Sequence, residues 1–252
     1  MRLSSDERER YKRHLLLPEV GGQGQQKLKA AKVLVVGAGG LGCPILSYLA
    51  AAGVGTIGIC DGDKVELSNL QRQTLYRVDD IGKPKAEVAG KALTALNPHN
   101  EYEVHPHFLD LKNADSLITG YDLIIEGLDR YAPRYTLNAA CLRGKKPLLS
   151  AAIGRFDGQV ALFEPGMKGK PCYACLVPEA PTDEAQCEAE GVLGAIPGVV
   201  GALAATEAIK WLWEMEGALT ETLLLYRGLD STLRRIRLKQ DPACPVCASP
   251  RP

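Results

Sequence analysis

The chain has 252 residues, of which 30 are basic and 30 acidic, so its formal net charge is zero. That balance excludes an overall field that recruits nucleic acid or an anionic membrane, and no apolar run reaches the ~20 residues of a membrane-spanning helix. The polar, charged start excludes a secretory signal, so the eight cysteines fit a reducing compartment and we expect a cytoplasmic protein without nucleic-acid or membrane partners.

The first thirty residues are expected to be mostly helical and charged. A short helix is predicted over 4–16, where Ser4 and Glu7 occupy the places of a capping box. Its basic residues, which include Arg13, fit a solvated helical face when the segment is taken alone. A glycine- and glutamine-rich link over 21–26 then leads toward the first strand.

The segment 32–61 has the order of a nucleotide-binding βαβ unit. A continuous apolar run over 33–36 fits a strand buried on both faces, and an alanine-rich helix pattern follows over 44–52. A second apolar run over 56–60 ends on Asp61. An acid at this place accepts hydrogen bonds from ribose hydroxyls in such units.

Glycines occupy the turn between this strand and this helix, at Gly37, Gly39, Gly40 and Gly42. Three of them take the G-x-G-x-x-G places of a dinucleotide fingerprint. Residues without a Cβ let backbone N–H groups approach a phosphate at the helix N-terminus, where the dipole favours negative charge. The setting predicts nucleotide binding, and the alternative is a merely tight structural turn.

Cationic side chains follow the second strand. The polar segment 68–73, SNLQRQ, carries Arg72, and Lys83 and Lys85 flank the start of an amphipathic helix predicted over 84–96. We expect these cations to lie at the same sheet edge as the glycines and to neutralise a triphosphate, which carries more charge than a dinucleotide pyrophosphate. The alternative is ordinary surface charge.

A strand predicted over 121–126 ends near Asp129. Because ligands lie beyond the carboxyl ends of strands in open parallel sheets, Asp129 is expected to project toward the crevice of Gly37. A carboxylate beside phosphates is repulsive unless a cation intervenes, so Asp129 is a candidate magnesium ligand. Its alternative role is to cap the next helix, which is predicted to continue over 136–143, and the two roles can coexist.

The succession of predicted elements changes after residue 158. Strand patterns over 158–164, 220–228 and 231–239 lack long crossovers between them, and a long helix is predicted over 197–215. No linker separates a second folding unit. The predicted fold class is therefore α/β, with a Rossmann-like, mostly parallel nucleotide-binding sheet extended by C-terminal antiparallel strands.

Two CxxC pairs, Cys172 with Cys175 and Cys244 with Cys247, suit a tetrahedral and closed structural zinc site. Because the pairs are far apart in sequence, the ion would pin the C-terminal tail to the body of the domain. A thioredoxin-like redox role is the alternative, although neither pair lies in a strand-to-helix context.

The remaining cysteines divide into two groups. Cys43, Cys60 and Cys141 fall in helix or strand patterns and are predicted to be small buried apolar residues. Cys187 lies in a polar, acidic stretch over 180–194, predicted to be a loop. Its acidic neighbours disfavour the thiolate, so an inert exposed cysteine is one interpretation.

With these residues in place, the chain resembles the MoeB/ThiF family, the bacterial relatives of ubiquitin-activating enzymes, and among them the molybdopterin-synthase adenylyltransferase (MoeB) type. The likeness covers nearly the whole length and rests, in order, on RYKRHLLLPEVG, VLVVGAGGLG, AGVG, CDGDKVELSNLQRQTLY, IGKPKAEVA, ALNP, GQVALF, CYAC, GVLGAIPGVVG and CPVC. It implies one adenylation domain over 1–252, comprising an N-terminal helical segment (1–30), a nucleotide-binding half (31–155) and a carrier-binding, zinc-bearing half (156–252).

The resemblance also implies a reaction. ATP and the C-terminal glycine carboxylate of a small ubiquitin-like sulfur carrier of the MoaD or ThiS type, ending in Gly-Gly, would give an acyl-adenylate and pyrophosphate ahead of thiocarboxylate formation. Hydroxide leaves badly from a carboxylate, whereas AMP leaves well from a mixed anhydride. Catalysis would then consist of positioning and charge stabilisation.

Family roles carry over to particular positions. ATP and Mg²⁺ are implied as ligands, and the expected nucleotide contacts are Gly37, Gly39, Gly40, Asp61, Asn69, Arg72, Lys85, Asp129 and Arg130. The expected catalytic set is Arg13, Arg72, Lys85 and Asp129. Arg13 would reach the phosphates of a partner subunit, which reverses its interpretation as a solvated residue and implies a homodimer.

Three points depart from the family or stay open. Arg130 stands where relatives commonly carry asparagine, and it could add a phosphate contact or pair with Asp129. Cys187 matches a position that is covalently active in some relatives, but no catalytic step is assigned to it. Because no sulfurtransferase domain is appended, a separate sulfur donor protein is expected. An NAD-dependent oxidoreductase and an inactive binding scaffold are the competing hypotheses.

Overall fold

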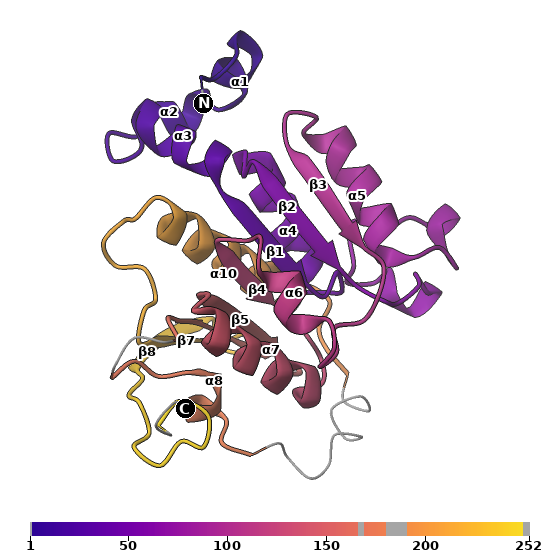
Figure 1. Ribbon diagram of the computed structural model, residues 1–252. Helices are drawn as coiled ribbons and strands as arrows, with labels where there is room; N and C mark the ends of the chain where they lie inside the picture. Colours follow the sequence, from indigo (N-terminus) through magenta and orange to yellow (C-terminus); the bar gives the residue numbers. More distant parts are fainter. Residues whose placement is uncertain (1, 166–168, 180–190, 249–252) are drawn as a thin grey trace.

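The computed structural model describes residues 2–165, 169–179 and 191–248 (Figure 1). Its strands form one sheet of eight in the order β3-β2-β1-β4-β5-β6-β7-β8. The five strands from β3 to β5 are parallel, and the last three run antiparallel to their neighbours. Their bounds are β1 Lys32–Val36, β2 Thr56–Cys60, β3 Glu101–His105, β4 Leu123–Glu126, β5 Leu148–Ile153, β6 Asp157–Phe163, β7 Thr222–Arg227 and β8 Thr232–Arg237. The predicted fold class is confirmed.

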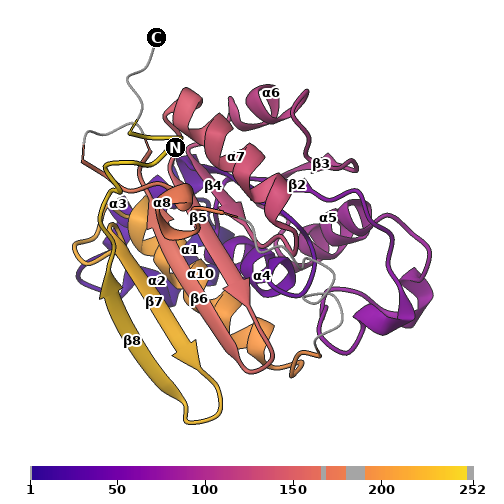
Figure 2. The ribbon, with the colours of Figure 1, turned by 90° about the horizontal axis from the view of Figure 1, so that it is seen from below.

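Helices cover both faces of the sheet (Figure 2). On one face α4 and α10 pack against each other, and α5 lies beside them; on the other face α6 packs against α7. Among the described residues no helix is long and apolar enough to cross a membrane. The α-helices are α1 Ser5–Arg10, α2 Lys12–Leu15, α3 Gly21–Ala30, α4 Gly42–Ala52, α5 Lys85–Leu96, α6 Ala114–Ile118, α7 Tyr131–Gly144, α8 Tyr173–Leu176 and α10 Ile196–Leu212.

The central strands are apolar on both sides because both sides are covered. Val33 and Val35 of β1 belong to the core under α4 and α10, whereas Leu34 and Val36 belong to the core under α6 and α7. A side-chain period of two in a doubly covered sheet requires a continuous apolar run instead of an alternating one. The run over 33–36 therefore predicted a central strand correctly.

One prediction for the first thirty residues was wrong, and another is confirmed with an interruption. The glycine-rich stretch 21–26 is helix, the first turns of α3. Gln25 is fully buried there and donates to the Ala52 carbonyl at 2.8 Å, so tertiary contacts override the poor helix propensity of glycine. The predicted helix over 4–16 is divided at Tyr11 into α1 and α2, and the capping box of Ser4 and Glu7 is confirmed.

The cap of α7 also differs from its prediction. The helix begins at Tyr131, and its N-cap residue is Arg130, with no side-chain capping bond. Asp129 is therefore not the N-cap. Its side chain is exposed and remains available for the other predicted role, that of a metal ligand.

Candidate active site

The glycine turn is fixed by close backbone contacts at the carboxyl ends of three neighbouring strands. Gly37 follows β1 with φ of +94°, a left-handed conformation, and its N–H donates to the Cys60 carbonyl at 2.8 Å. A Cβ on Gly37 would lie 3.1 Å from the Gly127 oxygen, and a Cβ on Gly42 would lie 2.0 Å from the Gly37 oxygen. Only glycine fits at Gly42, so α4 starts tight against the turn.

Asp61, directly after β2, is tied to this turn. One carboxylate oxygen accepts from the Ala38 N–H at 2.7 Å, and the other accepts from the Asp63 N–H at 2.8 Å. Burial raises the pKa of Asp61, and these N–H groups together with the Lys85 charge oppose the rise. Its carboxylate thus orients the turn backbone at the place where the sequence predicts a ribose contact.

The structure brings two of the predicted cations to the turn. A Cβ on Gly40 would lie 3.6 Å from Arg72 Cδ, so Arg72 borders the turn. Lys85 is only 6% exposed, and its Nζ lies 3.2 Å from an Asp63 carboxylate oxygen. Lys83 is instead exposed and pairs with Asp80 at 3.1 Å, so it is a surface ion pair.

Asn69 lies in the same segment as Arg72 and has a local partner. It is 7% exposed, and its Oδ1 accepts from the Glu66 N–H at 3.2 Å. The Arg72 guanidinium donates to the Ser68 carbonyl at 3.1 Å. These contacts fold the segment 66–73 back on itself and hold it beside the glycine turn.

Gln73 belongs to the site, although the sequence did not single it out. It is 4% exposed, and its Nε2 would lie 3.7 Å from a Cβ on Gly39. Its Oε1 has no hydrogen-bond partner among the described residues. Buried polar atoms are almost always bonded to protein, water or ligand, so this oxygen is an acceptor open to a ligand or an ordered water beside the glycine turn. The only sequence signal was its place in the polar segment SNLQRQ.

The loop 127–130 lies against the glycine turn. A Cβ on Gly127 would lie 2.9 Å from Leu41 Cβ, which places the loop over the start of α4. Asp129 and Arg130 are both exposed, and among the described residues neither side chain has a hydrogen bond or an ion pair. The structure therefore does not pair Arg130 with Asp129.

Arg13 lies far from the glycine turn of its own chain. Helix α10 begins beside the turn, where Pro197 would lie 3.4 Å from a Cβ on Gly40. At the other end of α10 the ring of Trp213 contacts His14 at a centroid distance of 5.3 Å. A helix of 17 residues is about 25 Å long, so Arg13, next to His14, lies about that far from the turn.

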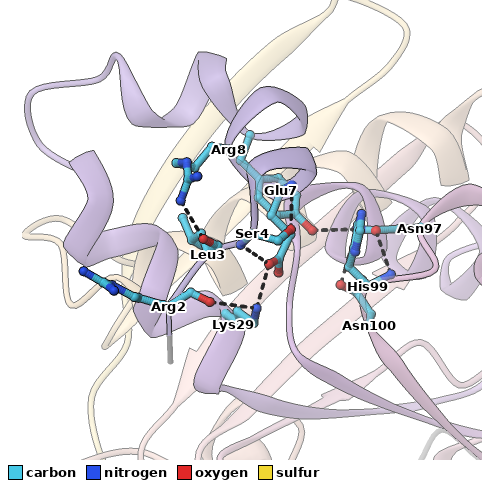
Figure 3. A network of polar contacts seen from close by, with 10 residues as sticks. Arg2, Leu3, Ser4, Glu7, Arg8, Lys29, Asn97, His99 and Asn100 are labelled. Carbon is cyan, nitrogen blue, oxygen red and sulfur yellow. Dashed lines mark hydrogen bonds and ion pairs between the residues drawn. The ribbon is translucent and has the colours of Figure 1, made fainter.

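A buried polar network, here called the N-terminal clasp, fixes the helices that carry Arg13. Glu7 is 3% exposed and accepts from Lys29 Nζ at 2.7 Å (Figure 3). The Tyr11 hydroxyl accepts from Asn97 Nδ2 at 2.8 Å. Burial alone would raise the pKa of Glu7, but hydrogen bonds from Lys29 and Ser4 lower it. The clasp comprises Ser4, Glu7, Tyr11, Gln25, Lys29 and Asn97.

The four predicted metal-binding cysteines are brought together. The Sγ atoms of Cys172, Cys175, Cys244 and Cys247 all lie within 4.8 Å of one another. Sγ of Cys172 is 3.8 Å from Sγ of Cys244, and Sγ of Cys175 is 3.4 Å from Sγ of Cys247. Thiolates about 2.3 Å from a tetrahedral ion are about 3.8 Å apart, so the cluster fits such an ion. It joins the C-terminal tail to the body of the domain, as predicted.

The other cysteines in the described ranges are packing residues. Cys43, Cys60 and Cys141 are buried free thiols, and burial raises the pKa of each to about 12. The prediction of small buried apolar residues is confirmed, since such thiols hardly ionise. Cys187 lies outside the described residues.

Comparison with known proteins gives consistent results. Residues 11–246 match the model of the ThiF family. The chain is 47% identical to the sulfur carrier protein adenylyltransferase of Thermus thermophilus, over 98% of this chain and 93% of that protein. It is 45% identical to the adenylyltransferase and sulfurtransferase MOCS3 of Anopheles gambiae, of which it spans 56%.

A solved structure agrees with the sequence relatives. E. coli MccB with AMPCPP and MccA superposes with a TM-score of 0.84 at 25% identity, over 98% of this chain and 76% of that chain. The match to the family model covers most of the chain, and the Thermus relative covers nearly all of it. The chain belongs to the ThiF family.

Proposed function

We propose that the chain is an ATP-dependent adenylyltransferase acting on a small ubiquitin-like sulfur-carrier protein. It transfers AMP to the carrier's C-terminal glycine carboxylate and releases pyrophosphate. The names of its relatives support this reaction, since the Thermus protein is a sulfur carrier protein adenylyltransferase. The observation that carries the proposal is the unpaired Gln73 Oε1 beside a glycine turn that also faces Arg72 and Lys85.

The catalytic contribution of the site is positioning and charge. ATP would lie along the backbone of the turn at Gly37, Gly39 and Gly40, and the crystallised complex of MccB with AMPCPP supports a nucleotide in this fold. Arg72 and Lys85 would neutralise phosphate oxygens while the carrier carboxylate attacks the α-phosphate in line. Lys85 is well suited because it is buried and held by Asp63.

Asp129 is proposed to hold Mg²⁺. It is exposed, it lies on the loop beside Gly37 and it has no partner among the described residues, and carboxylate oxygens are the ligands that Mg²⁺ prefers. An ion held by Asp129 would supply positive charge that offsets the phosphate charge. The exposed neighbour Arg130 adds a cation at the same edge, where it would contact a phosphate.

Zn²⁺ is proposed for the cysteine cluster, because four thiolates at tetrahedral spacing suit that ion. Donors already surround the sulfurs: Asn138 Nδ2 lies 3.7 Å from Cys172 Sγ, and Gln240 Nε2 lies 3.5 Å from Cys247 Sγ. Four protein ligands leave no open position for substrate, so the role is structural.

A homodimer is proposed to complete the site. The separation of about 25 Å between Arg13 and the turn of its own chain supports a role for this residue in the partner's site. Arg13 is exposed on α2, and the N-terminal clasp fixes the helix that precedes it.

We further propose one adenylation domain over 1–252, a separate sulfur donor protein and a cytoplasmic location. The seven free thiols among the described residues suit the reducing conditions of the cytoplasm.

Carrier-dependent exchange of labelled pyrophosphate into ATP tests this proposal. Exchange that requires both Mg²⁺ and a carrier ending in Gly-Gly is the expected result, and a carrier lacking its last glycine is the matched control. A purified protein that binds NADH tightly and ignores ATP would instead be an oxidoreductase. A protein that binds the carrier without exchange would be a scaffold.

A further inference from the structure

A buried ion pair holds the residue next to Asp129. Glu126, at the end of β4, is 1% exposed and pairs with Arg134 at 2.8 Å. The other oxygen of Glu126 accepts from the Leu128 N–H at 3.0 Å, and Arg134 Nη2 donates to the Leu128 carbonyl. Both backbone groups of Leu128 are therefore bound to this pair. Asp129, which has no side-chain partner among the described residues, takes its position from them.

Arg134 has further contacts that fix it. It donates to the Ala151 carbonyl at 3.1 Å, and the Ser150 hydroxyl lies within 3.5 Å of Nη1. Its guanidinium also lies over the ring of Tyr173 at 5.9 Å from the centroid. A cation over an aromatic ring is attracted more strongly in a buried place than at an exposed one. Tyr173 is thus part of what holds Arg134 in place.

Tyr173 belongs to the cysteine cluster by sequence and by contact. It follows Cys172, and its N–H donates to Asn138 Oδ1 at 3.0 Å. Asn138 is fully buried, and its Nδ2 lies 3.7 Å from Cys172 Sγ. Asn138 and Arg134 are four residues apart on α7, so they lie on one face of that helix. One turn of α7 therefore contacts the cysteine cluster and the next holds the loop that carries Asp129.

From this continuous path we infer that the cysteine cluster is coupled to the nucleotide site through Asn138, Tyr173 and Arg134. A metal ion in the cluster fixes Cys172, which orders the Tyr173 ring under Arg134, and Arg134 in turn positions the loop 127–130. Arg134 and Asn138 are positioning residues, since neither contacts substrate. The inference rests on the proposed function because it takes Asp129 as the ligand of Mg²⁺ and nucleotide.

Coupling between two binding sites is reciprocal. If the metal-loaded cluster favours the loop geometry that binds Mg²⁺ and nucleotide, the metal raises the affinity for nucleotide by some factor. Bound nucleotide must then raise the affinity of the cluster for its metal by the same factor. Couplings of this kind usually correspond to about 5- to 150-fold in affinity. A cluster that served only to anchor the C-terminal tail would give no such factor, so the two roles make different predictions.

The experiment uses the full-length protein loaded with Zn²⁺ and measures binding of Mg²⁺ and AMPCPP by calorimetry. We expect removal of Zn²⁺ by a chelator to weaken nucleotide binding about tenfold. In the converse assay, Mg²⁺ and AMPCPP should slow the transfer of Zn²⁺ to the chelator. Equal nucleotide affinity with and without Zn²⁺, together with equal release rates, would overturn the inference.

Two variants test the path itself. Zn²⁺-loaded Asn138→Ala and Tyr173→Leu should each bind Mg²⁺ and AMPCPP more weakly and lose the effect of nucleotide on Zn²⁺ release. Tyr135→Phe is the matched control: it removes a hydrogen bond of 2.9 Å to the Val177 carbonyl near the same cluster but keeps the aromatic ring that packs against Tyr173. If one path variant fails to retain Zn²⁺, the other still decides the result.

The outcomes separate this inference from the proposed function. Loaded wild-type protein that binds no Mg²⁺ and AMPCPP would contradict the proposed function and the inference together. A second outcome is wild-type protein that binds nucleotide through Asp129 with the same affinity whether or not Zn²⁺ is present. That result would contradict the inference alone. Path variants that behave like Tyr135→Phe would also reject it.

Discussion

The N-terminal clasp and the site at the glycine turn differ in how their buried polar groups are bonded. At the amino end, the clasp pairs Glu7 with Lys29 and Tyr11 with Asn97. At the carboxyl end, Gln73 Oε1 is buried without a partner, and the Asp129 side chain has no hydrogen bond or ion pair among the described residues. The clasp is complete by itself, although Trp213 Nε1, beside His14 at the same end, is also buried without a partner among the described residues. The carboxyl end differs because its unpaired atom lies beside a glycine turn bordered by cations.

This difference follows from the cost of burying polar atoms. An unsatisfied buried donor or acceptor costs about 1–3 kcal/mol, so a fold that needs only stability satisfies all of them. The clasp follows that rule. A ligand site departs from it, because the missing partners belong to the ligand. The contrast therefore predicts that substitutions at the two ends affect different measurements.

The largest effect is expected at Asp129. Asp129→Asn should lower carrier-dependent pyrophosphate exchange by roughly 100- to 1000-fold. Mg²⁺ would lose its carboxylate ligand, and the phosphate charge would be left uncompensated. The melting temperature should not change, since the side chain is exposed and has no partner among the described residues. Near-normal exchange would remove Asp129 from the metal site and weaken the contrast between the two ends.

Mixed dimers test whether Arg13, at the amino end of the sheet in one subunit, serves the site at the carboxyl end of the sheet in the other. Arg13→Ala and Asp129→Ala should each be inactive alone, while a mixed dimer has one site with every group intact. Random mixing should therefore restore roughly a quarter of the wild-type rate, since about half the dimers are mixed and each has one working site. Titrating one variant into the other and measuring exchange gives the result, and no recovery would show that Arg13 does not serve the neighbouring site.

A smaller effect is expected at Gln73. Gln73→Leu replaces the amide, with its unpaired oxygen, by an apolar side chain of similar size. The free energy of unfolding should therefore stay the same or rise. Affinity for Mg²⁺ and AMPCPP should fall about tenfold, the equivalent of one hydrogen bond of about 1.4 kcal/mol. Calorimetry beside a denaturation curve measures both. A loss of stability with unchanged affinity would make Gln73 a structural residue.

The smallest effect on activity is expected in the clasp. Glu7→Gln should lower the free energy of unfolding by about 1–2 kcal/mol at neutral pH, because Lys29 loses its charged partner. Each subunit should still exchange pyrophosphate at close to the wild-type rate, provided that α2 keeps its place. Denaturation in urea at neutral pH measures the first effect.

The pH dependence of the same variant has a definite sign. The pKa of Glu7 is lowered in the folded state, so its stabilisation is complete above the ordinary value of 4.5 and is lost as the pH falls through the folded value. The difference between wild type and Glu7→Gln should thus be constant near neutrality and shrink below pH 4.5. A difference that grows on acidification would contradict the pairing with Lys29.

Much of the fold could be predicted from the sequence because its signals are local. The runs over 33–36 and 56–60 are apolar throughout, as a doubly covered sheet requires, and both are strands. The glycine spacing fixed the turn, because only residues without a Cβ allow the contact between Gly37 and Gly42. The paired CxxC spacing likewise predicted the cysteine cluster.

What the sequence did not reveal depends on partners distant along the chain. The glycine-rich start of α3 is helical because Gln25 bonds to Ala52, a contact between residues 27 positions apart. Gln73 is informative only once its burial and its missing partner are known. The pairing of Glu126 with Arg134 has no sequence periodicity, so it emerged only from three-dimensional contact.

The span of α10 has a consequence for how this chain can vary. This helix abuts the glycine turn through Pro197 at one extremity and is followed by Trp213, against His14, at the other. Adding one residue within it would rotate everything downstream by about 100° and advance it by about 1.5 Å, which would misregister one of the two contacts. Natural insertions and deletions should therefore avoid Ile196–Leu212 and accumulate in the loops that flank it.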